Sequence, residues 1–309
     1  MKNINELLGT KYPIIQGGMA NIATAELAAA VSNAGGLGLI GAGGNDALWV
    51  KNEIDRIRTL TDKPFGVNIM LMSPHAPEIA QLLIDENVKV VTTGAGNPVP
   101  YMSAWKAAGM IVVPVIPTVR LAMRVEQAGA DAVIAEGMEA GGHIGKLTTM
   151  AMIPQIADAV NIPVIAAGGI ADKRGVLAAF ALGAKGIQVG TVLLATKECP
   201  IHENYKKLIV ESTDTSTVIT GSNKAPVRVI KNEMAVKYNS LIESGASFEA
   251  LEQLTLGSLK KAVIDGDIES GSFMAGQIAG VVKEIHTVKE VIETMFKDIN
   301  NYKDTLNIL

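Results

Sequence analysis

Cysteine is nearly absent from this sequence, which has one such residue, Cys199, among its 309. A single cysteine excludes an internal disulfide and any metal site built from several cysteines, and we expect no metal centre. Aromatic residues make up only 4% of the chain and charged residues 19%. No apolar run is long enough for a membrane-spanning helix or a signal sequence. We therefore expect a cytoplasmic protein that does not enter a membrane.

The charge balance argues against nucleic acid as a partner. The formal net charge is -4, and no basic stripe with interleaved aromatic residues occurs, so we expect no nucleic-acid partner. Apolar residues reach 48% and glycine contributes 31 residues, so Ala, Val, Ile and Gly must carry the packing. Such a composition suits a parallel sheet that is covered on both faces.

Short apolar segments alternate with longer helical patterns up to about residue 196. The expected strands are 12–16, 36–40, 65–69, 90–93, 111–115, 132–135, 164–166 and 186–189. The expected helices include 24–33, 46–61, 77–87, 119–128, 153–160 and 172–182. Eight strand-then-helix units in a row predict an α/β fold, a (β/α)₈ TIM barrel, because right-handed crossovers place each strand beside the last.

The pattern changes near residue 197, where the chain becomes more charged and includes the threonine-rich stretch TSTVITGS. We expect residues 1–196 to form the barrel and residues 197–275 to form a small insertion, or lid subdomain, over the barrel mouth. Residues 276–309 are expected to be C-terminal helices that return to the barrel.

Glycine-containing turns follow the last two predicted strands, in IPVIAAGGIADKRG and GAKGIQVGTVLLAT. In many barrels the loops after strands 7 and 8 hold a phosphate. Gly168 and Gly169 allow backbone N–H groups to approach its oxygens, beside a helix expected to begin at Asp172. Gly190 and Thr191 would begin a second, shorter helix. Charge-assisted hydrogen bonds, at about 1.5–3 kcal/mol each, would contribute more than the helix dipoles.

The sequence EGMEAGGHIG follows strand six and places His143 between glycine and Ile144, on a loop at the catalytic face of the barrel. An imidazole there can act as a general acid or as a donor to a developing oxyanion. We therefore expect His143 to be catalytic.

Two further strand ends are suited to a flat ligand. In PIIQGGMA, Gly17 and Gly18 permit backbone contact and Met19 offers a soft surface. In FGVNI, Asn68 offers an amide that can satisfy a ring carbonyl.

Together these motifs closely resemble the flavin-dependent enoyl-acyl-carrier-protein reductases, relatives of the nitronate monooxygenases that were formerly called 2-nitropropane dioxygenases. The resemblance runs from YPIIQGGMA through AGGHIG, LTTM, PVIAAGGIAD and GIQVGT to MAGQIAG. It implies a homodimer that uses FMN, and NADH or NADPH, to reduce trans-2-enoyl-acyl carrier protein in fatty-acid elongation. It also suggests a monovalent cation, whose site the sequence does not place.

The resemblance also implies residue roles. The flavin ring and ribityl chain would be held by Gly17, Gly18, Met19, Asn68 and Glu136. The phosphate would be held by Gly168, Gly169, Gln188, Gly190 and Thr191. Gly141 would also contact the cofactor, His143 would stand over the reacting ring, and Met274 and Gly276 would close from the other side.

The residue after His143 separates the two branches of the superfamily. Monooxygenases usually carry arginine there, whereas this chain has Ile144, followed shortly by LTTM as in the reductases. Ile144 removes a cation that could hold a nitronate and provides an apolar wall for an acyl chain. We expect a reductase, with a nitronate monooxygenase using FMN and O₂ as the alternative and a non-catalytic flavin-binding barrel as a third possibility.

Two further expectations concern the partner and a related barrel. An acidic carrier protein requires basic residues near the barrel mouth to bind it, and Lys206, Lys207 and Lys224 are the candidates.

Barrels that resemble IMP dehydrogenase share the sequence AGGI but need a nucleophilic cysteine after strand six. The single cysteine of this chain, Cys199, lies elsewhere, which argues against that class.

Overall fold

The computed structural model describes residues 3–222 and 225–305, which include eight parallel strands that form one closed sheet. The strands are β1 (Ile14–Gln16), β2 (Gly38–Gly41), β3 (Phe65–Met70), β4 (Val90–Gly94), β5 (Ile111–Ile116), β6 (Val133–Glu136), β8 (Val164–Ala167) and β9 (Gly186–Val189). They are ordered β1-β9-β8-β6-β5-β4-β3-β2, and a parallel bridge between Ile15 and Leu37 closes the ring. The predicted (β/α)₈ barrel is confirmed.

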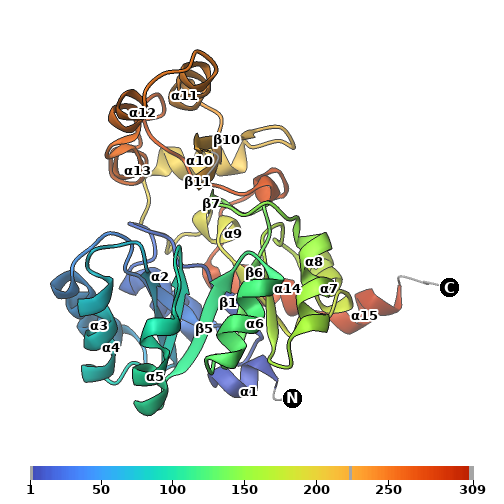
Figure 1. Cartoon of the computed structure of the whole chain (residues 1–309). Helices are drawn as coiled ribbons and strands as arrows, with labels where there is room; N and C mark the ends of the chain where they lie inside the picture. Colours follow the sequence, from blue (N-terminus) through green and yellow to red (C-terminus); the bar gives the residue numbers. More distant parts are fainter. Residues whose placement is uncertain (1–2, 223–224, 306–309) are drawn as a thin grey trace.

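Helices surround this sheet, and those from α2 to α8 connect each strand to the next (Figure 1). They are α2 (Ala25–Asn33), α3 (Ala47–Leu60), α4 (Ala76–Asp85), α5 (Val99–Ala107), α6 (Val119–Gln127), α7 (Thr149–Ala159), α8 (Lys173–Ala181), α9 (Thr191–Leu194) and α14 (Val288–Phe296). The expected start of α7 at residue 153 is wrong, because both carboxylate oxygens of Glu139 accept the N–H of Thr149, at 3.0 and 2.9 Å, and start the helix earlier. Within the described ranges, none of the helices combines the length and apolarity needed to cross a membrane.

Two apolar clusters make up the core. One lies between the sheet and the helices. The other fills the barrel interior with Ile15, Leu37, Leu39, Val90, Val113, Ala132, Ile134, Ile165 and Ala167. Ile4 and Leu8 of the short helix α1 (Ile4–Leu8) belong to this inner cluster and are 0% and 3% exposed. Helix α1 therefore covers one end of the barrel, at the bottom of Figure 1.

The later part of the chain contains α10 (Glu203–Val210), β10 (Thr217–Ser222), β11 (Ala225–Ile230), α11 (Glu233–Glu243), α12 (Phe248–Thr255), α13 (Ser258–Lys260), the π-helix η1 (Lys261–Asp265), the 3-10 helix η2 (Gln277–Val281) and α15 (Ile299–Asp304). Strands β10 and β11 pair antiparallel, and β11 also pairs with β7 (Gly142–His143) from the loop after β6. Figure 1 shows α11, α12 and α13 beyond the end of the barrel opposite α1. The division at residues 197 and 275 stays a prediction.

Candidate active site

A pocket of about 500 Å³ lies at the C-terminal ends of the barrel strands, within the usual size range for cofactor sites. All but one of the residues predicted for the site line it: Gly17, Gly18, Met19, Asn68, Glu136, Gly141, His143, Gly168, Gly169, Gln188, Gly190, Thr191 and Met274. The exception, Gly276, lies behind the wall, where its N–H donates to Oγ1 of Thr191 at 2.9 Å. The fold thus gathers residues that are far apart in the sequence.

One part of the pocket is suited to an anion. Gly168 and Gly169 have φ values of +93° and +76°, a left-handed conformation that favours glycine. A Cβ at Gly168 would lie 3.0 Å from the carbonyl oxygen of Gly137. Among the described residues, none accepts the N–H of Gly169, Gly190 or Thr191. These three donors lie at the turns after β8 and β9, which matches the expected position of a phosphate.

Helix α8 contributes less to this anion site than its sequence suggests. Asp172 is its N-cap, and Oδ1 of Asp172 accepts the N–H groups of Arg174 at 2.9 Å and Gly175 at 3.4 Å. The guanidinium Nε of Arg174 also donates to Asp172, at 2.9 Å. Because these first-turn amides already have a carboxylate acceptor, the anion site consists of the Gly168–Gly169 turn and the start of α9.

The polar wall of the pocket offers groups that need a partner. The side-chain oxygen Oε1 of Gln188 is buried and has no hydrogen-bond partner within the described residues. Burial raises the pKa of Glu136 to about 7, so this carboxyl can hold a proton near neutral pH. The amide Nδ2 of Asn68 donates to Oγ1 of Thr92 at 2.9 Å, which fixes the side chain. A ligand with both N–H donors and carbonyl acceptors fits this wall.

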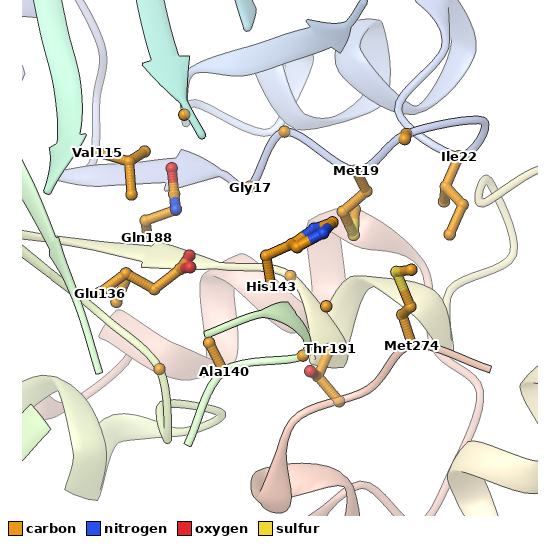
Figure 2. Close-up of a pocket in the computed structure, with 18 of the residues that line it drawn as sticks. Gly17, Met19, Ile22, Val115, Glu136, Ala140, His143, Gln188, Thr191 and Met274 are labelled. Carbon is orange, nitrogen blue, oxygen red and sulfur yellow. The ribbon is translucent and has the colours of Figure 1, made fainter. Parts of the chain in front are cut away.

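His143 enters the pocket from β7, and Figure 2 shows its ring between Glu136 and Gln188 on one side and Met19 on the other. Val227 of β11 pairs with His143, which fixes the backbone of the loop. Partial burial lowers the pKa of His143, so the imidazole is neutral at neutral pH and retains one N–H donor.

A buried brace, which we define as Glu139, Thr149 and Arg228, holds the His143 loop and was not anticipated from the sequence. Arg228 is 4% exposed, and its Nε donates to the carbonyl of Met138 at 3.1 Å, while Nη1 donates to Thr217 at 3.3 Å. Burial lowers the pKa of Arg228, and the nearby Glu139 carboxylate opposes that shift. Arg228 lies 90 residues beyond Met138. No short sequence motif therefore predicts the contact between Arg228 and Met138.

The structure leaves fewer exposed lysines near the barrel mouth than the sequence predicts. The side chain of Lys206 is 7% exposed, and its Nζ lies 3.0 Å from Oε1 of Glu203. Lys207 is exposed and lies 3.8 Å from Glu211. Lys224 falls outside the described residues. Lys206 therefore cannot serve as an exposed contact, and Lys207 is the candidate that stays on the surface.

Comparisons with known proteins agree on one family. The family model described as nitronate monooxygenase matches residues 2–82 and 78–298. A probable nitronate monooxygenase of Staphylococcus saprophyticus is 34% identical, over 96% of this chain and 97% of the relative. A Rhodococcus jostii protein named (3aS,4S,5R,7aS)-5-hydroxy-7a-methyl-1-oxo-octahydro-1H-indene-4-carboxyl-CoA dehydrogenase is 31% identical, over 99% of this chain and 98% of that one. The structure of FabK from Thermotoga maritima is 47% identical with a TM-score of 0.95, covering 99% of this chain and 98% of that chain.

Proposed function

The chain belongs to the nitronate monooxygenase family, and on that premise we propose that it reduces trans-2-enoyl thioesters carried on acyl carrier protein. It is an FMN-dependent oxidoreductase. The observation that carries the enoyl-reductase assignment is the 47% identity to FabK across 99% of the chain.

The residues of the pocket fit FMN. The unpaired buried oxygen of Gln188 and the free amides at Gly169, Gly190 and Thr191 match a ligand with polar ring edges and a phosphate. The phosphate would be held by Gly168, Gly169, Gly190 and Thr191, whereas Gln188, also expected at the phosphate, has an acceptor oxygen that suits a ring N–H instead. The ring and ribityl chain would be held by Gly17, Gly18, Met19, Asn68 and Glu136. The chemistry that FMN supplies when bound is transfer of two electrons from a reduced nicotinamide to an activated double bond.

His143 stabilises the charge that the reaction creates. Addition of hydride at the β-carbon of an enoyl thioester moves an electron pair onto the thioester oxygen, and a proton then reaches the α-carbon. The neutral His143 imidazole donates a hydrogen bond to that oxygen or orders the proton donor. Loop 137–148 holds the ring in place for this role, since Met138 N–H donates to the Leu147 carbonyl at 2.8 Å.

Ile144 places no positive charge beside His143, which argues against capture of a small anion. Its side chain is buried, its N–H donates to the carbonyl of Pro226 at 3.1 Å, and it does not line the pocket, so the expected apolar wall for an acyl chain is not found at this position. A thioester substrate also agrees with the name of the Rhodococcus jostii relative, a carboxyl-CoA dehydrogenase. The nicotinamide, the monovalent cation and the homodimer stay predictions to which we assign no residues.

The alternative is a nitronate monooxygenase, which the family model and the staphylococcal relative favour. One experiment separates the two functions. The purified protein should be yellow, and NADH or NADPH should bleach its visible spectrum under nitrogen. Re-oxidation by crotonyl thioester supports the reductase, whereas re-oxidation that requires a nitronate and O₂ supports the monooxygenase. A colourless protein that does not bind added FMN would exclude both.

A further inference from the structure

We propose that Leu259 sets the length of acyl chain that the pocket accepts. This inference rests on the proposed function, since it names the part of the site that receives the acyl chain. Two observations support the inference: polar and apolar side chains lie in different parts of the pocket, and Leu259 reaches the pocket from a segment outside the barrel strands.

The pocket carries the polar side chains of Glu136 and Gln188, together with Val115, on one side of His143 and a wall of apolar side chains on the other. Figure 2 shows Glu136 and Gln188 on one side of the ring and Met19, Ile22 and Met274 toward the other. Leu259 and Ile278 also line this pocket. An acyl chain must extend away from the reacting carbons, which lie at His143, and it gains free energy only along an apolar surface. The part of the apolar wall beyond Met19, which also contacts the flavin, is therefore the acyl subsite.

Leu259 reaches this subsite from a different part of the chain. Among the residues described between 197 and 273, it alone lines the pocket. The other apolar lining residues come from the barrel, from Met274 at the end of segment 197–275, or from Ile278 in the segment that returns to the barrel. Leu259 is half-buried and packs on the main core.

The support of Leu259 is a fixed segment. It continues from α13 into the π-helix η1, a geometry that recurs at functional sites. Ala262 and Val263 anchor η1 with 0% and 1% exposure. The N–H of His202 donates to the carbonyl of Val263 at 2.9 Å, and the N–H of Ser272 donates to the carbonyl of Ser258 at 2.9 Å. A residue held this firmly limits the space in front of it.

The methionines of the apolar wall do not impose the same limit. Met19 and Met274 carry unbranched thioethers, which adapt to ligands of different shape. Leucine is branched and has fewer accessible side-chain conformations than methionine. Ile22 is branched too, but it is 3% exposed and belongs to the core between the sheet and the helices, whereas Leu259 comes from α13, beyond the end of the barrel. Leu259 is thus the residue that determines chain length.

Removal of this side chain should lengthen the subsite. Each methylene that becomes buried changes binding about 4-fold. We expect Leu259→Ala to raise kcat/KM for dodecenoyl thioester relative to crotonyl thioester by roughly 10-fold, and Leu259→Trp to lower the same ratio by a similar factor. A matched control is Leu256→Ala, because Leu256 is 77% exposed, lies three positions away and does not line the pocket.

The test measures kcat/KM for enoyl thioesters of four, eight and twelve carbons in the flavin-loaded wild type and variants. Calorimetric titration of the same proteins with saturated acyl-CoA of each length reports binding without turnover. Opposite shifts in Leu259→Ala and Leu259→Trp, with no shift in Leu256→Ala, support the proposal. Equal changes at all lengths, or the same change in the control, overturn it. If the wild type reduces no enoyl thioester, the proposed function fails, and a flat calorimetric series in all variants then also rejects the role of Leu259.

Should Leu259→Ala lower the thermal midpoint strongly, Leu259→Val removes one carbon and keeps the branch. It should shift the chain-length ratio in the same direction by about 4-fold. An unchanged ratio in a folded Leu259→Val protein would count against the proposal.

Discussion

The two sides of the pocket are held in place by different means. The side that we propose faces the flavin consists of turns directly after barrel strands, such as Gly17, whose N–H donates to the carbonyl of Val189 at 2.8 Å, so the sheet itself fixes it. His143 sits on a loop that depends on β11 and on the brace of Glu139, Thr149 and Arg228. Changes to the first side should therefore alter cofactor binding, and changes to the second should alter turnover.

The largest effect should come from His143→Ala. Loss of the imidazole removes the donor to the developing charge, so turnover should fall by about 10²-fold or more. Bound flavin should stay at the wild-type ratio, because His143 is not among the groups that hold the phosphate. Steady-state kinetics and the absorbance ratio of flavin to protein measure the two quantities. Near-normal turnover would reject the catalytic role, and loss of flavin would break the distinction between the two sides.

Gly168→Ala tests the barrel side. A left-handed φ of +93° costs a non-glycine residue about 1–3 kcal/mol, and the new methyl would press on the Gly137 carbonyl. We expect the Kd for FMN to rise by roughly 10-fold or more, since 1.4 kcal/mol corresponds to a factor of ten. Fluorescence titration of the apoprotein gives the Kd. With FMN at saturation, kcat should recover most of its wild-type value, and a kcat that stays low would show that the two sides are coupled.

Arg228→Met tests the brace. The substitution keeps a long apolar stem but removes two charged hydrogen bonds, and we expect kcat to fall several-fold while flavin occupancy is unchanged. The conservative Arg228→Lys should recover part of kcat by restoring the charge beside Glu139. The pH profile of kcat/KM should shift with the altered position of His143. An unshifted profile together with a lowered thermal midpoint would show that Arg228 is structural only.

The smallest effect concerns Glu136. Its folded-state pKa of about 7 lies above the ordinary carboxyl value of 4.5, so the folded protein binds a proton that the unfolded chain has lost between these values. The free energy of unfolding therefore falls as pH rises from 4.5 to 7 and levels off above 7. Solvent access through the pocket reduces the effect to about 1 kcal/mol. Glu136→Gln should remove this slope in urea unfolding at pH 5 and 7.5, and equal slopes in both proteins would contradict it.

Much of the barrel and its site can be predicted from sequence, because each strand end combines an apolar run with a glycine turn. The strand expected at 186–189 matches β9 residue for residue, and the residues predicted at Gly17, Gly168 and Gly190 line one pocket. These features follow from local chemistry and from the closure of a parallel sheet.

The remaining features depend on contacts between distant segments. The start of α7 is set by the carboxylate of Glu139 and not by a residue next to the helix. Arg228 and Leu259 lie in segments with no periodic pattern that points toward the pocket. A helix was expected to begin at Asp172, but the effect of its side chain was not, since a carboxylate that accepts hydrogen bonds from the first turn of α8 competes with an external anion for those donors.

The packing of helix α1 has a kinetic consequence. Ile4 and Leu8 belong to the apolar cluster that fills the barrel interior. A ligand therefore cannot pass through the barrel from one end to the other. Any electron donor and any electron acceptor must then reach the pocket from the same side, at the C-terminal ends of the strands. If the two share one position there, we expect a double-displacement rate law, in which reciprocal plots at several fixed donor concentrations are parallel lines.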